Sequence, residues 1–167
     1  NDQKIADKIK KLRNYGSAIK YQHELPGINS RMDELTAAFL RVKLSKLDEW
    51  NARRQVFAET YLQRLNGVNG LQLPRVMSGC QPSWHLFVVR HRKREALQKA
   101  LDDRNIHALF HYPIPVHLSE AYRQLGYGEN DFPVAERVAR EAISLPIGPH
   151  LTSEQICEVA EAVIEIN

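Results

Sequence analysis

The chain has 167 residues, with 23 Lys and Arg against 20 Asp and Glu and a formal net charge of +3. Hydrophobic residues make up 43% and charged residues 26%, which excludes a disordered tail and a collagen-like or low-complexity chain. No apolar run approaches the roughly 20 residues that a membrane helix needs. The basic excess is too small and too evenly spread to indicate nucleic acid binding.

The first thirteen residues are polar and basic, without the apolar core of a secretory signal. The two cysteines, Cys80 and Cys157, lie far apart and form no Cys-x-x-Cys pair. We therefore expect a cytoplasmic protein with no structural zinc. The chain enters a helical pattern at once and without an initiator Met, so we also expect that a segment upstream is missing.

The spacing of apolar residues predicts a first helix that ends before Gly16, with Asn1 or Asp2 as its cap. A polar loop with a Pro26–Gly27 turn follows over residues 14–30.

One long helix is predicted over residues 31–66, with Ser30 as its N-cap, because neither Pro nor Gly interrupts the pattern before Gly67. About 35 helical residues span roughly 50 Å, which exceeds a small domain. Such a helix must leave the compact body, bend, or connect two bodies.

After Gly67 the pattern alternates between short apolar runs and amphipathic stretches, which indicates an α+β fold. Strands are predicted over residues 71–74, 84–90 and 106–110, helices over 95–103, 119–125 and 131–142, an extended segment over 145–149, and a last helix with a capping box at Thr152 and Gln155.

Residues 20–31 place Tyr, His, Asn and Arg side chains directly before the predicted long helix. A helix N-terminus offers free N–H groups and a positive dipole end to an anion such as phosphate. The residues alone favour the plainer interpretation, a polar turn that caps the helix.

Residues 111–117 hold His111, Tyr112 and His117 in a loop stiffened by Pro113 and Pro115. Such a loop suits a ligand contact, although a Pro-rich turn with surface histidines is the plainer alternative. A metal site is weakly supported, because no third ligand is near.

Three other features are interpreted as structural. Residues 145–150 form an extended crossover before the last helix, the basic run over residues 90–94 is a solvated turn, and His85 and His107 are edge or half-buried strand residues. The chain contains no G-x-G-x-x-G, P-loop, G-x-S-x-G or H-E-x-x-H motif.

Residues 27–38 read G-I-N-S-R-M-D-E-L-T-A-A and resemble the G-x-N-x-R-x-D-E-x-x-A-A motif of the DegT/DnrJ/EryC1/StrS sugar aminotransferases. Further segments resemble the same family in the same order, so the resemblance covers nearly the whole chain. These segments are residues 20–23, 43–54, 84–90, 111–118, 132–136 and 145–151.

The resemblance implies a pyridoxal-phosphate enzyme of the aspartate-aminotransferase fold, known as fold type I. Members move an amino group, usually from glutamate, to a ketone on a nucleotide-linked sugar, and they are homodimers with shared active sites. The segment from His111 to Leu118 is most similar to members that act on dTDP-3-keto-6-deoxyhexoses, and 4-keto sugars stay possible.

Site residues follow from the resemblance, one motif at a time. Asn29 is expected to reach the cofactor phosphate of the partner subunit, with Arg31 beside it. The expected substrate-binding residues are Tyr21, His23, His111, Tyr112 and His117.

The resemblance also implies a division into the tail of the large cofactor domain (1–30), a connecting helix (31–66) and a small C-terminal α+β domain (67–167). None of the lysines lies in the family's Schiff-base lysine motif, and the chemistry requires that lysine. We therefore expect no catalytic residue here and an inactive chain unless a longer or complementing chain supplies it. The alternatives are a truncated remnant that only folds and dimerises, or a small basic domain that binds nucleotides or nucleic acid.

Overall fold

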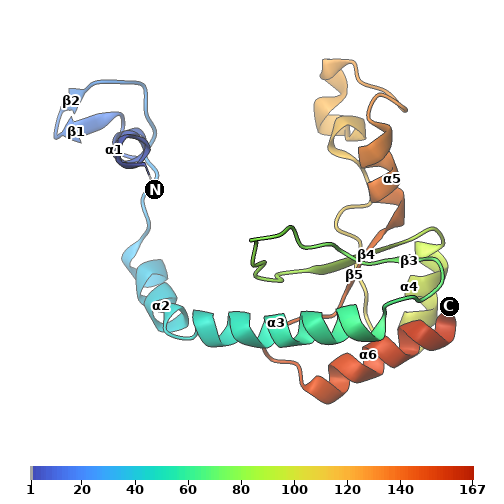
Figure 1. Cartoon of the computed structure of the whole chain (residues 1–167). Helices are drawn as coiled ribbons and strands as arrows, with labels where there is room; N and C mark the ends of the chain where they lie inside the picture. The colour runs from blue at the N-terminus through green and yellow to red at the C-terminus, as the bar shows by residue number, and fades with distance from the viewer. Residues whose placement is uncertain (1) are drawn as a thin grey trace. The chain divides into compact units, whose positions relative to one another are not determined.

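The computed structural model describes residues 2–167 and divides into two compact units, Asn1–Leu47 and Asp48–Asn167 (Figure 1). Asn1, one of the two caps expected for the first helix, lies outside the described residues. None of the described helices is both long and apolar enough to cross a bilayer.

The first unit begins with α1, Gln3–Leu12, and the expected cap is confirmed: the Asp2 carboxylate accepts two backbone N–H groups of the first turn. The chain then forms an antiparallel hairpin of β1, Ser17–Ile19, and β2, Gln22–His23, where only a loop is predicted. Strands of three and two residues are too short to show an alternating pattern.

Two helices, α2 at Glu34–Leu44 and α3 at Leu47–Arg64, occupy the region in which one continuous helix is expected. The interruption lies at Ser45, whose hydroxyl donates to the Val42 carbonyl at 2.7 Å. A serine hydroxyl that bonds to a nearby carbonyl competes with the helical backbone pattern. The expectation of an unbroken helix is therefore wrong.

The second unit contains an antiparallel sheet in the order β3, Leu71–Gln72, then β4, Phe87–His91, then β5, Ala142–Leu145. In the register of the two longer strands Phe87 lies opposite Leu145. Every residue of β5 is buried, as in a strand that is covered on both faces.

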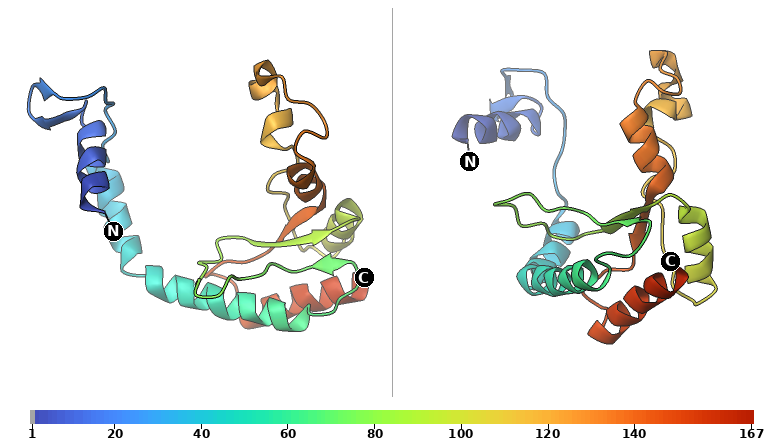
Figure 2. Two further views of the ribbon diagram at one scale, coloured as in Figure 1. Left: turned by 45° about the horizontal axis from the view of Figure 1, so that its top comes forward. Right: turned by 45° about the vertical axis from the view of Figure 1, so that its right-hand side comes forward.

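Helices α3 and α6, Ser153–Ile166, lie along one side of this sheet (Figure 2) and supply much of the core. The helix α4, Arg94–Asp102, packs against α6. Because α3 contributes buried residues, the end of the expected connecting helix belongs to the core of the second unit. The largest fully buried side chains are Tyr61, Phe87, Leu65, Leu97, Leu101, Ile143, Ile156, Val89 and Val163.

The remaining helices follow the expected order. The helix α5 covers Pro133–Glu141, with its proline in the first turn, and α6 begins with the expected capping box of Thr152 and Gln155. The expected helix over residues 119–125 is the 3₁₀ helix η2, Glu120–Leu125.

A second 3₁₀ helix, η1 at Val116–Leu118, precedes it. The strand expected over residues 106–110 is an extended segment that meets the sheet through one bridge, between Leu109 and Ser144. The structure is thus the α+β mixture that was expected, with differences at its shortest elements.

Candidate functional site

The segment that carries Asn29 is held as an extended stretch against the end of α1. The Ile28 N–H donates to the Leu12 carbonyl at 2.8 Å, and the Ser30 N–H donates to the Arg13 carbonyl at 2.9 Å. The Asn29 side chain is exposed, and within the described chain no residue hydrogen-bonds to its amide. The backbone is fixed while the amide stays free for a ligand.

Arg31 is already engaged within the first unit. Its Nη2 donates to Asn14 Oδ1 at 2.6 Å, and its guanidinium lies 5.8 Å from the centre of the Tyr15 ring. Arg31 and Asn14 line a hollow of about 750 Å³. The other lining residues are Asp7, Lys10, Lys11, Arg13, Ser17, Ala18 and Met32. The charged lining residues are four basic ones and one acidic one, a balance that suits an anion, although Asn29 is not part of the lining.

His23 is bound on one edge of its ring. Its Nδ1 lies 2.9 Å from the Tyr15 carbonyl oxygen and 2.9 Å from Ser17 Oγ. Because a carbonyl only accepts, Nδ1 carries a proton, and in the neutral ring Nε2 is then left as an acceptor. Tyr21, in the hairpin turn, is 81% exposed.

The start of α2 is closed by a carboxylate, which corrects the expectation that Ser30 caps it. Asp33 accepts from the Thr36 N–H at 2.8 Å and from the Thr36 hydroxyl at 2.7 Å. These hydrogen bonds, the backbone one foremost, hold the pKa of Asp33 below its usual value. A negative cap at the N-terminus disfavours a second anion at that end of the helix, and the expected contact of Asn29 with a phosphate stays a prediction.

In the second unit, His111 and Tyr112 lie side by side at the end of the extended segment. His111 Nδ1 lies 2.9 Å from Ser144 Oγ on β5. The two rings meet edge to face, with centroids 5.7 Å apart, and Tyr112 is 75% exposed. This pair presents polar groups at the surface of the second unit, as expected of a ligand contact.

His117 is turned inward. Its Nε2 lies 3.3 Å from Glu136 Oε1, and the two side chains are only 9% and 4% exposed. The same oxygen accepts the N–H groups of Asn130 and Phe132, at 2.8 and 3.3 Å. His117 is therefore joined through Glu136 to the loop between η2 and α5 in this structure, and its expected contact with substrate stays a prediction.

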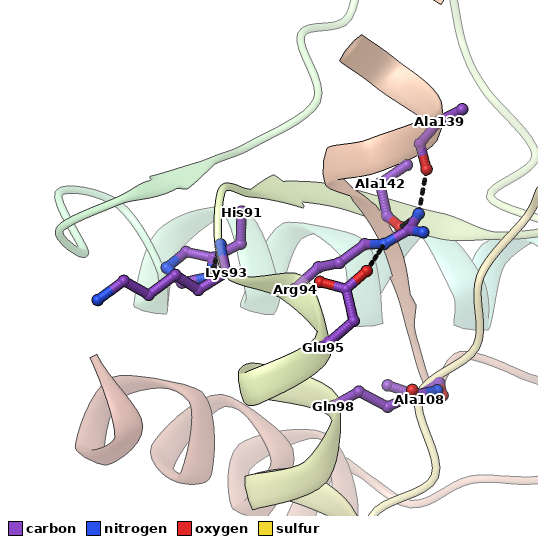
Figure 3. A network of polar contacts seen from close by, with 8 residues as sticks. All are labelled: His91, Lys93, Arg94, Glu95, Gln98, Ala108, Ala139 and Ala142. Carbon is purple, nitrogen blue, oxygen red and sulfur yellow. Dashed lines mark hydrogen bonds and ion pairs between the residues drawn. The ribbon is translucent and has the colours of Figure 1, made fainter. Parts of the chain in front are cut away.

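Arg94 links the end of α5 to the extended segment that precedes His111 (Figure 3). This buried side chain donates to the carbonyls of Ala139 and Ala142 at the end of α5 and to Glu95. A cation at carbonyls that the helix leaves unpaired is favourable. Its guanidinium also lies 4.1 Å from the centre of the Phe110 ring, next to His111.

The basic run over residues 90–94 is thus not simply a solvated turn. Besides Arg94, Arg90 is engaged, because its Nε and Nη2 donate to the Glu141 carboxylate at 3.0 and 2.6 Å. From the same helix as Arg94, Gln98 donates to the Ala108 carbonyl at 2.7 Å. These contacts hold the segment that leads to His111.

The third candidate segment, residues 145–150, is anchored in the core. The Pro146 carbonyl accepts from the buried Tyr61 hydroxyl at 2.7 Å, and burial raises the pKa of that phenol. This contact supports the structural interpretation. Within residues 2–167, no group of three or more His, Cys, Asp or Glu side chains is placed to hold a metal ion.

The structure brings together the expected site residues in two groups, one in each unit. Tyr21, His23, Asn29 and Arg31 belong to the first unit, and His111, Tyr112 and His117 belong to the second. Sequence reasoning missed Ser144, whose only signal is a polar residue in an apolar strand. It also missed the role of Glu136, although that residue lies in a segment that resembles the family.

The sequence profile of the DegT/DnrJ/EryC1/StrS aminotransferase family matches residues 1–164. The chain belongs to this family. It is 52% identical over 153 residues to the erythromycin biosynthesis sensory transduction protein EryC1 of Saccharopolyspora erythraea, covering 92% of this chain and 42% of that protein. It is 49% identical over 164 residues to the dTDP-3-amino-3,4,6-trideoxy-alpha-D-glucose transaminase of Streptomyces venezuelae, covering 98% and 43%.

Solved structures of family members have the same fold. The crystal structure of S. venezuelae DesV in complex with a ketimine intermediate matches with a TM-score of 0.89 and 49% identity, over 98% of this chain and 44% of that one. A family aminotransferase from Brucella abortus matches with a TM-score of 0.84 and 26% identity. The chain spans less than half the length of these relatives.

Proposed function

We propose that this chain is the C-terminal part of a nucleotide-sugar aminotransferase. The whole enzyme moves an amino group from glutamate, through pyridoxal phosphate, to a keto group of a dTDP-keto-6-deoxyhexose. The observation that carries the proposal is the family match over residues 1–164. Two relatives, at 49% and 44% identity, are named as transaminases of dTDP-3-amino sugars, which supports the 3-keto sugar and disfavours a non-catalytic remnant.

In this proposal the second unit is the small domain of a fold-type I enzyme, and the region of α2 and α3 connects it to the large domain. The active sites are shared between two subunits of a homodimer. The reactive lysine comes from the part of the enzyme that the relatives possess outside the matched region, so this chain supplies the walls of the pocket.

The residues present fit one end of pyridoxal phosphate and not the other. The free amide of Asn29 can donate to a phosphate, and Arg31, which is bonded to Asn14 in this structure, adds a positive charge to the same segment. The lysines of the described chain lie at its surface, Lys11 half-buried and the rest exposed, and the covalent lysine is assigned to the part of the enzyme outside this chain. When bound, the cofactor supplies the electron sink for amino transfer.

The sugar nucleotide is assigned to the exposed aromatic and histidine groups. Tyr21 and Tyr112 offer exposed rings and hydroxyls, His23 offers a free Nε2 acceptor, and His111 offers its own Nε2. His117, which Glu136 holds inside the fold in this structure, keeps its expected substrate contact as a prediction.

The proposal is tested by replacing the matching region of the S. venezuelae transaminase with this chain. We expect the chimera to retain bound pyridoxal phosphate and to transfer the amino group of glutamate to a dTDP-3-keto-6-deoxyhexose. Chimeric protein that binds the cofactor but aminates no dTDP-keto sugar contradicts the proposed function.

In the same chimera, Asn29→Ala is expected to weaken cofactor binding by about ten- to a hundredfold, the effect of losing a hydrogen bond to a charged group. The control is Asn66→Ala, which changes an exposed asparagine of the second unit. Equal cofactor affinity in the two variants contradicts the role of Asn29.

A further inference from the structure

The hydroxyl of Ser144 has one hydrogen-bond partner in the described chain. Ser144 lies in β5 and is 5% exposed. Its backbone N–H donates to the Leu109 carbonyl at 2.8 Å, and its carbonyl accepts from the Leu109 N–H at 3.2 Å. The backbone is thus paired, and the hydroxyl meets only His111 Nδ1, at 2.9 Å.

This isolation decides the direction of the hydrogen bond. If His111 Nδ1–H were the donor, the hydroxyl hydrogen of Ser144 would be buried without an acceptor. If Ser144 donates instead, its hydrogen is used and only oxygen lone pairs stay unpaired, which folded proteins tolerate better than an orphaned donor. The serine is therefore the donor, and Nδ1 of neutral His111 carries no proton.

The opposite nitrogen of the ring reaches solvent. No described residue hydrogen-bonds to His111 Nε2, and the only buried side-chain nitrogen or oxygen without a partner in residues 2–167 is Arg54 Nε. His111 Nε2 is consequently accessible. With Nδ1 unprotonated, the neutral ring carries its proton on Nε2.

We propose that Ser144 is a positioning residue that holds neutral His111 in the Nε2–H tautomer, so that the ring offers an N–H donor to an oxygen of a bound nucleotide sugar. The identity of the ligand rests on the proposed function. The tautomer does not, because it follows from contacts within the second unit. The Arg94–Phe110 contact and the Leu109–Ser144 bridge fix the backbone on which the ring is mounted.

The test is nitrogen-15 NMR of the histidine rings in the ligand-free 167-residue chain at about pH 9, where an ordinary imidazole is neutral. A His111→Gln spectrum identifies the His111 signals. We expect a protonated Nε2 and an unprotonated Nδ1. His107 is an internal comparison with the opposite result expected, because its Nδ1 lies 3.1 Å from an Asp102 carboxylate oxygen, which only accepts.

Ser144→Ala is expected to release His111 into the mixture of tautomers of a free imidazole, and Ser144→Thr is expected to restore the Nε2–H form. Unchanged His107 signals show that the variants are folded. A His111 that carries its proton on Nδ1 in the unaltered chain overturns the proposal, whether or not the variants fold. A tautomer that Ser144→Ala leaves unchanged also overturns it.

The second part of the proposal, that the His111 N–H donates to the nucleotide sugar, is tested in the chimera. Ser144→Ala is expected to raise KM for the dTDP sugar several-fold while kcat changes less, because the lost orientation weakens binding. An unchanged KM overturns this half. Since the NMR spectrum is recorded without ligand, failure of the proposed function and failure of the tautomer assignment are separate results.

Discussion

Glu136 is a buried carboxylate around which a long loop is ordered. One of its oxygens accepts from His117 Nε2 and from the backbone N–H groups of Asn130 and Phe132. The Phe132 ring packs edge-on against His117, with centroids 4.8 Å apart. A buried charge is tolerated only when it is hydrogen-bonded in this way. Glu136 therefore links η1 to the loop between η2 and α5.

We expect Glu136→Gln to lower the free energy of unfolding by about 2 kcal/mol, since hydrogen bonds to a charged acceptor are replaced by weaker ones to an amide. Urea unfolding followed by tryptophan fluorescence measures the change. The matched control is Glu129→Gln, which changes an exposed glutamate of the same loop and is expected to have little effect. Equal losses in the two variants contradict the role given to Glu136.

At the scale of elements, the backbone of the first unit comes close to another backbone segment at Gly16. Gly16 has φ +76°, and a Cβ there would lie 1.6 Å from the Leu25 carbonyl oxygen. Gly126, which ends η2 in the second unit, also has φ +76°, but a Cβ there meets nothing within 4 Å. A substitution at either glycine would place a side chain at positive φ, which costs free energy at both positions. Only at Gly16 would the added Cβ also clash with another part of the backbone.

Gly126→Ala is expected to cost about 1 kcal/mol, the penalty of the left-handed conformation for a residue with a Cβ. Gly16→Ala is expected to disorder the β1–β2 hairpin, because the added Cβ would push the Leu25 backbone away from Gly16, whose carbonyl accepts the Glu24 N–H next to β2. Amide NMR signals of residues 14–30 should be lost while those of β4 and α6 persist, since the core of the second unit contains no residue before Phe57. A retained hairpin contradicts the steric argument.

Because Asp33 caps α2 through its carboxylate, the stability of this helix depends on pH. The pKa of Asp33 is held below its ordinary value of 3.8 by hydrogen bonds from Thr36. The cap therefore stabilises α2 fully above that ordinary value, and the stabilisation is lost as the pH falls through the lowered pKa. Carbon chemical shifts of residues 34–44 should show the loss. In Asp33→Asn the cap does not titrate, and an equal acid loss there contradicts the assignment.

A helix or strand can be predicted from the sequence where the residues that determine its ends lie close together in the chain. The caps of α1 and α6 were predictable because a cap and its partner lie within four residues. The break at Ser45 was not, because serine is common inside helices and neither Pro nor Gly marks the site. The extended segment expected from residue 145 begins three residues after the observed start of β5 at Ala142, because α5 runs into the strand without a turn.

The candidate site was predictable only where the motifs carry it. The resemblance pointed to Asn29, Arg31, His111 and Tyr112 as ligand-facing residues, and the structure leaves the Asn29 amide and the Tyr112 ring exposed. Ser144 lies 33 residues from His111, and Glu136 lies 19 from His117. Contacts at such separations arise from tertiary packing, to which no spacing rule applies.

At the scale of the whole molecule, α2 is the longer of two α-helices, α1 and α2, that have no buried residue. None of its residues is buried, and four large apolar side chains are about 70% exposed. These are Leu35 at 73%, Phe39 at 69%, Val42 at 71% and Leu44 at 67%. Leu35, Phe39 and Val42 have the i, i+4, i+7 spacing of one helix face, and an exposed apolar surface of this kind marks an interaction site. Under the proposed function, the rest of the enzyme or its second subunit covers the helix.

We therefore expect the 167-residue chain alone to bind a hydrophobic dye and to self-associate as its concentration rises. The double variant Leu35→Gln, Phe39→Gln should reduce both effects strongly, because it removes apolar area from the centre of the surface. The control is Met77→Gln, which removes one apolar side chain of the second unit that is 78% exposed. Dye fluorescence and sedimentation velocity measure the two effects. A chain that stays monomeric without binding dye, or a control that matches the double variant, shows that α2 is not the surface the complete enzyme covers.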